Sequence, residues 1–106
     1  MFIELGRFTR DVVVKKVKVG DEEKSVLNNC LAVHHDKENT SFIDISAWNG
    51  IAELIGKYLK KGDEVFVEGE LRSRKVKYGD KEITMPFILI VKIRFTHGNK
   101  TLVDYV

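Results

Sequence analysis

The sequence predicts an all-β domain with one helix, built as a small closed barrel of five strands with the helix between the third and fourth strands. Three observations lead to this fold class. Apolar and polar residues alternate along several segments, one segment alone repeats its apolar residues at helical period, and turn-forming residues separate the segments. A chain of 106 residues suffices for a modest core, so we expect residues 1–106 to form a single domain.

The part of the chain before the helix is expected to hold three strands. The first is apolar, crosses a turn region at Thr9–Asp11 and continues in a basic stretch that ends at a glycine turn. A polar loop over residues 36–40 separates the second strand from the third. The expected boundaries are 2–8 with 12–19 for the first strand, 25–35 for the second and 41–48 for the third.

The third strand has the clearest period of two, which directs alternate side chains to opposite faces. The face expected to lie toward the core carries Ile43, Ile45 and Ala47. The other face carries Phe42, Asp44, Ser46 and Trp48. This outward face, with two large aromatic rings, is the first candidate binding surface.

The helix is expected in the next segment, where apolar residues recur at spacings of three and four and form one face. These residues are Ile51, Leu54, Ile55, Tyr58 and Leu59. Asn49 is expected to cap the N-terminus, and Gly62 is expected to end the helix. The lysines near its C-terminus suit the helix dipole.

The fourth strand is expected over residues 64–76, again with a period of two. Val65, Val67 and Leu71 would share the face toward the core, and Gly69 is a candidate for a bulge that shifts the count. The other face carries Phe66, Arg72, Arg74 and Val76.

A hairpin tip over residues 78–81 leads into the last strand, expected over residues 82–95. Pro86 should lie at an edge of the sheet there, because proline cannot donate to a ladder. Three strands, a helix and two further strands form the order of the OB architecture. Another small barrel, or an open meander with a packed helix, is the alternative.

Basic residues are clustered although the formal net charge is only +2. Residues 7–18 and residues 72–81 each contain five basic residues and one acidic residue. Such clusters create a local positive potential that attracts nucleic acid, although a solvated strand face is the other interpretation of each cluster alone.

The outward faces of the third and fourth strands together suit single-stranded DNA. Unpaired bases stack on aromatic rings, at about 1–3 kcal/mol each, while phosphates need cations along a groove. Phe42 and Trp48 provide rings about 20 Å apart along one strand, and Arg72 and Arg74 provide cations on the next. The remaining candidate contacts are Arg10, Lys15, Lys16, Lys75, Tyr78 and His34.

A different interpretation exists for each of these side chains. Trp48 could pack on the helix or on another subunit, and Phe42 could be a core residue. The two arginines could pair with Glu68 and Glu70, a use of charge that guards strand edges. Asp44, between the aromatic residues, is expected to pair with one of the arginines.

We expect no catalytic, metal-binding or cofactor site, and hence no enzyme. Cys30, the one cysteine, lies in an apolar strand without a base nearby and is interpreted as a core residue. His34 and His35 lack partners at metal-ligand spacing, and no glycine-rich nucleotide loop occurs. A single cysteine is typical of a protein in the reducing cytoplasm. The sequence has no apolar stretch long enough to span a membrane and no signal-peptide pattern, so we expect a cytoplasmic protein without a membrane partner.

Segments in series resemble the family of bacterial and phage single-stranded DNA-binding proteins. Gly-Arg-Phe-Thr-Arg-Asp at residues 6–11 is similar to the family's Gly-Arg-Leu-Thr-Arg-Asp start. The other resembling segments are Phe42–Trp48, Ala52–Leu54 with Tyr58–Asp63, and Val65–Arg74. They occur in the family's order and spacing over nearly the whole chain.

The resemblance implies sequence-independent binding and protection of single-stranded DNA in replication, recombination and repair. It implies that Phe42 and Trp48 stack on bases and that Arg72 and Arg74 contact the DNA backbone. It also implies a homo-oligomer assembled partly through first-strand edges, as a homotetramer or, alternatively, a dimer. The implied compartment is the bacterial cytoplasm or nucleoid, or a phage-infected cell.

The sequence departs from the family at several positions. Val76 stands where an aromatic residue often follows the two arginines, so stacking is expected to be weaker or shifted toward Tyr78. Asn29 stands where relatives are apolar and needs a hydrogen-bond partner if buried. The chain stops at residue 106 without the acidic tail that recruits replication proteins. We interpret it as a truncated chain or the short form of phages and mobile elements, with that recruiting role in doubt.

Two other functions stay open at this point. One is a dimeric primosomal or accessory OB-fold protein that binds DNA but mainly bridges proteins. The other is an OB-fold module that binds RNA or acts as a structural adaptor. The oligomeric state would test the first, and affinities for single-stranded DNA, RNA and duplex would test the second.

Overall fold

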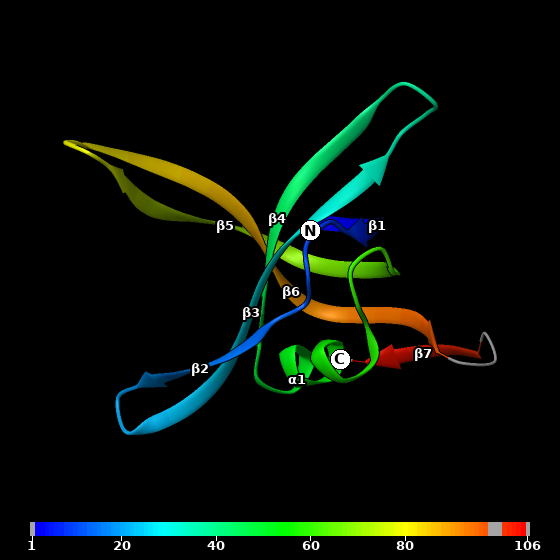
Figure 1. Cartoon of the computed structure of the whole chain (residues 1–106), viewed down its shortest axis with the longest axis horizontal. Coiled ribbons are helices and arrows are strands. Elements are labelled where there is room, and N and C mark those ends of the chain that lie inside the picture. Colours follow the sequence, from blue (N-terminus) through cyan, green and yellow to red (C-terminus); the bar gives the residue numbers. More distant parts are fainter. Residues whose placement is uncertain (1, 98–100, 106) are drawn as a thin grey trace.

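The computed structural model describes residues 2–97 and 101–105 and shows a mainly β fold with one helix in these ranges (Figure 1). The elements are β1 (Phe2–Phe8), β2 (Val14–Val19), β3 (Glu22–His34), β4 (Thr40–Trp48), α1 (Asn49–Tyr58), β5 (Glu64–Tyr78), β6 (Lys81–His97) and β7 (Thr101–Tyr105). The predicted fold class is therefore confirmed, with the helix between β4 and β5. The structure adds β7, which pairs with β6 and was not expected from the sequence.

The strands close into a ring in the order β1, β5, β6, β4 and β3. The pairs are antiparallel except for a short parallel contact between β4 and β6, at Ile45–Ile88 and Ser46–Leu89. The end of β1 pairs with β3 at Arg7–Ala32 and thereby completes the ring. β2 lies outside it as a hairpin partner of β3.

The core fills this ring, and it includes Ile45, Ala47, Val65 and Val67, which the alternation predicts to point inward. Leu27, Leu31, Ile45, Val67 and Ile93 are fully buried, and each such side chain contributes about 1.5–3 kcal/mol. The helix packs on the same cluster through Ala52 and Ile55. No helix in the described part of the chain has the length and apolar character that a membrane span needs.

Three hairpins extend beyond the ring (Figure 1). They join β2 to β3, β3 to β4 and β5 to β6, and the last stays paired as far as Tyr78 and Lys81. Its tip is tightened by Gly79, whose φ of 62° suits glycine. Because the hairpin faces continue the face of the ring, they extend the candidate binding surface.

The register of β5 and β6 shifts between Glu68 and Gly69, the position at which the sequence predicts a bulge. Glu68 pairs with Lys92 and Gly69 pairs with Ile90, so the extra residue is Val91 of β6 and the count along β5 does not shift. A Cβ at Gly69 would overlap the backbone carbonyl of Leu89, so only glycine fits there. The prediction that Leu71 faces the core is wrong, because this side chain is 70% exposed. Leu71 lies beyond the bulge, where β5 leaves the covered part of the ring.

The helix ends differ from those expected. Trp48, not Asn49, is the N-cap residue, and no side chain makes a capping hydrogen bond. Asn49 is the first helical residue and has a φ of 53°, a conformation that asparagine tolerates better than most residues. At the other end the N–H of Leu59 donates to Ile55, so the helix ends before Gly62, which lies in the following turn.

The predicted edge position of Pro86 is confirmed. It pairs with Ser73 of β5, and the contact of β6 with β4 begins only at Ile88. Its missing N–H therefore costs no ladder bond there.

Candidate nucleic-acid interface

A groove runs across the outer face of β3, β4, β5 and β6. It consists of three open hollows, named here the Tyr78 hollow (about 220 Å³), the Lys15 hollow (about 280 Å³) and the Trp48 hollow (about 370 Å³). Asn28 lines all three, and Arg74 lines the Tyr78 and Trp48 hollows. These shared walls make the hollows one continuous surface, which we call the central groove.

The two aromatic residues of β4 lie on the face that holds this groove. Phe42 is 66% exposed and Trp48 is 37% exposed, so neither ring is sealed beneath the helix or inside the core of the chain. Trp48 lines its hollow beside Phe87. Phe42 lies farther along the same face, on the hairpin of β3 and β4, opposite Ala32. The rings are therefore both available and separated along one strand.

The two arginines of β5 are held in different ways. Arg72 forms an ion pair with Glu70 at 2.7 Å, and because both side chains are half-exposed, such a pair contributes at most about 1 kcal/mol. Arg74 donates a hydrogen bond from Nη2 to Oγ of Ser46 at 3.3 Å. Its guanidinium carbon lies 4.2 Å from the ring centroid of Phe87.

The acidic partners expected for these arginines are only partly present. Of the two glutamates considered, Glu70 alone forms an ion pair with an arginine of β5 among the described residues. The expected ion pair between Asp44 and an arginine is not found in the described chain, although Asp44 and Arg74 line the same hollow. Among the described residues Arg74, unlike Arg72, therefore has no ion-pair partner in the groove.

The basic residues of the first cluster divide between two surfaces. Arg10 and Lys15 are exposed and line the Lys15 hollow. Lys16 turns to the helix, where its Nζ donates to Ser25 at 2.8 Å and to Glu53 at 3.2 Å. The hydrogen bond from Ser25, and then the hydrogen bond and positive charge of Lys16, hold the pKa of Glu53 below its ordinary value.

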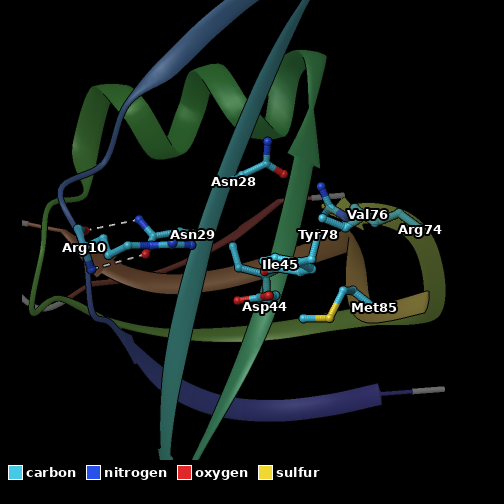
Figure 2. A pocket seen from close by; sticks show the side chains of 9 residues that line it. All are labelled: Arg10, Asn28, Asn29, Asp44, Ile45, Arg74, Val76, Tyr78 and Met85. Carbon is cyan, nitrogen blue, oxygen red and sulfur yellow. Dashed lines mark hydrogen bonds between the residues drawn. The ribbon is translucent and has the colours of Figure 1, made fainter. Parts of the chain in front are cut away.

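The three remaining predicted contacts lie toward the hairpin tips. Tyr78 is 61% exposed and lines its hollow opposite Arg10 (Figure 2). His34 is exposed on the hairpin of β3 and β4, with Nδ1 2.8 Å from Oγ1 of Thr40. Lys75 points to the opposite face of β5 from Arg74 and forms an ion pair with Glu82 at 3.5 Å. The structure therefore does not bring Lys75 into the groove.

Three residues at the groove were not singled out as site residues from the sequence. Asn28 is exposed at the junction of the three hollows, and Phe87 lies beneath Arg74. Asn29 is fully buried and has the partners that its burial requires, because it bonds both N–H and C=O of Arg10 (Figure 2). The adjacent asparagines in an apolar strand were the available signal for two of them.

The chain is similar in sequence to proteins of one known family. The model of the "Single-strand binding protein family" matches residues 1–96. "Single-stranded DNA-binding protein" of Treponema pallidum is 39% identical over 75 residues, 67% of this chain and 43% of that protein. "Single-stranded DNA-binding protein 1" of Xylella fastidiosa is 44% identical over 46 residues, 43% of this chain and 32% of that protein. The matched segments thus span less than half the length of these relatives.

Proposed function

The chain belongs to the single-strand binding protein family, and on this basis we propose that it binds single-stranded DNA, without sequence preference, along the central groove. The observation that carries the proposal is that Trp48, Arg72 and Arg74 line one open hollow. An aromatic ring and two cations there meet both requirements of an unpaired strand, a surface for bases and charge for phosphates.

The path that we propose follows the exposed charges and rings. From the Lys15 hollow, where Arg10 and Lys15 meet the phosphates, the strand crosses Asn28 to the rings of Trp48 and Tyr78. Phe42 and His34 extend the surface along the hairpin of β3 and β4. The binding is non-catalytic, because it needs only stacking and charge.

Lys16 and Lys75 have weaker support as contacts. Each is engaged with a glutamate outside the groove, Lys16 with Glu53 and Lys75 with Glu82. We propose that they add to the positive potential along the strand without touching it in the groove.

The wider role that we propose is protection of exposed strands during replication, recombination and repair, by a homo-oligomer. The side of β1 away from β5 pairs with β3 only at its end, and Ile3 and Leu5 are about half exposed. An open strand edge with apolar side chains supports assembly through β1. We propose a homotetramer, with a dimer as the alternative that light scattering distinguishes.

Competition binding with a fluorescent oligo-dT probe tests the proposed function. Unlabelled single-stranded DNA of any sequence should displace the probe, while duplex DNA of the same length should displace it far less. Preferential displacement by RNA would favour the RNA-binding alternative. Absence of probe binding at low salt would refute nucleic-acid binding along this groove.

A further inference from the structure

The guanidinium of Arg74 lies over an aromatic ring. Its guanidinium carbon lies 4.2 Å from the ring centroid of Phe87, on the neighbouring strand β6. Phe87 is half-buried and pairs directly with Arg72. The ring therefore lines the groove, with the guanidinium of Arg74 over it.

A chain of hydrogen bonds also holds the guanidinium of Arg74. Arg74 donates to Oγ of Ser46 at 3.3 Å, and Ser46 in turn donates to Oδ1 of Asn28. Ser46 is only 4% exposed, whereas Asn28 is exposed, so Ser46 is the buried link of this chain. The four residues come from β3, β4, β5 and β6, and together they cross the centre of the groove.

The contacts of Arg74 differ from those expected of a side chain whose main role is to contact a phosphate. It has no carboxylate partner among the described residues, whereas Arg72 is paired with Glu70. A guanidinium is planar and weakly hydrated, and it stacks well on rings. When one face lies on Phe87, the other face can receive a base, as arginine planes do in single-strand recognition.

We propose that Arg74 and Phe87 together form a stacking platform for one nucleobase, with Ser46 and Asn28 as its positioning residues. Arg74 then acts mainly as a flat stacking surface. The negative charge of the DNA backbone is balanced by Arg72 and by the basic residues of the Lys15 hollow. The inference rests on the proposed function, since it assigns a role within the same groove. It differs from the backbone contact that family resemblance implies for Arg74.

Two substitutions test the planar guanidinium and the aromatic ring separately from positive charge and apolar bulk. Arg74→Lys keeps the charge and Phe87→Leu keeps an apolar side chain, and each should weaken oligo-dT binding by about 5-fold to 150-fold, the range for one stacked base. The affinity of the double variant for oligo-dT should be only slightly lower than that of the single variant with the lower affinity, because the two residues act as one unit. The salt dependence of Phe87→Leu should match that of the unsubstituted protein.

Matched controls make the same chemical changes outside the groove. Arg7→Lys lies on β1, where Arg7 pairs with Glu64, and Phe2→Leu alters a half-buried ring packed against the core. Both should bind oligo-dT within about twofold of the unsubstituted protein. Phe87→Tyr retains the ring and should restore binding, which distinguishes loss of stacking from loss of folding.

An abasic oligonucleotide of the same length gives the deciding comparison. Phe87→Leu should bind it as the unsubstituted protein does, because only the base contact is lost. Equal losses on the abasic and oligo-dT strands, or unchanged oligo-dT binding by Phe87→Leu, would overturn the platform. Failure of the unsubstituted protein to bind oligo-dT would instead refute the proposed function itself.

Discussion

Asn29 and Arg10 exchange hydrogen bonds between a buried side chain and the backbone of the segment that joins β1 to β2. The N–H of Arg10 donates to Oδ1 of Asn29 at 3.3 Å, and Nδ2 of Asn29 donates to the carbonyl of Arg10 at 3.1 Å. The same Oδ1 accepts from the N–H of Cys30 at 2.7 Å. A fully buried amide thus fixes the backbone that presents Arg10 to the groove.

Asn29→Leu should therefore lower the free energy of unfolding by about 1–3 kcal/mol, because it removes a fully buried amide whose hydrogen bonds hold the partly buried N–H and C=O of Arg10. Urea denaturation measures this change. The neighbouring substitution Asn28→Ala should cost less than about 1 kcal/mol, because Asn28 is exposed and water can replace its bonds. Equal costs for the two variants would contradict the role of Asn29.

Phe42→Ala should weaken oligo-dT binding by about 1–3 kcal/mol, the contribution of one base stacked on an aromatic ring. Its effect on stability should stay below about 0.5 kcal/mol, because the ring is exposed. Leu71 is equally exposed, at 70% against 66% for Phe42, but lies on the other face of β5 from Arg72. Leu71→Ala is the control and should not change binding; a matching loss there would point to a nonspecific effect.

Arg72→Ala and Lys15→Ala should each flatten the dependence of log affinity on log salt concentration by about 0.7, the value for one phosphate contact on a single strand. Titrations with oligo-dT at four or more salt concentrations give the slope. Lys57→Ala removes an equal charge from the helix, where Lys57 lies over the ring of Tyr58, and should leave the slope unchanged. Slopes unaltered by all three changes would put the phosphate path elsewhere.

Ser25→Ala should raise the pKa of Glu53 toward its ordinary value, since the hydrogen bond from Ser25 is the largest cause of the lowered pKa. A group with a lowered folded pKa stabilises fully above its unfolded pKa, and this contribution is lost as pH falls through the folded value. The stability difference between the two proteins should therefore shrink under acid. NMR titration of the Glu53 carboxyl measures the shift directly, and an unchanged value in Ser25→Ala would contradict it.

The local patterns of the sequence predicted the fold well where one segment determines its own burial. The alternation of Ile43, Ile45 and Ala47 and the apolar face of the helix are examples. Leu71 shows the limit, because its pattern matches that of Val65 and Val67 while its exposure depends on where the hairpin leaves the ring.

The candidate site was less accessible to sequence reasoning because its geometry arises from strand pairing. Lys15 and Lys16 are equivalent in the sequence, yet one reaches the groove and the other reaches Glu53, 37 positions away along the chain. Phe87 lies in a nearly continuous apolar run, where no alternation marks it as facing the groove. Its contact with Arg74 becomes visible only when β5 and β6 are aligned.

The most direct test of the groove as a base-stacking surface is the fluorescence of Trp48, the one tryptophan of the chain. Titration with oligo-dT should quench its emission with a saturable curve, and duplex DNA at the same concentrations should not. Saturable oligo-dT binding, detected by anisotropy of the labelled strand, with unchanged Trp48 emission would contradict the account.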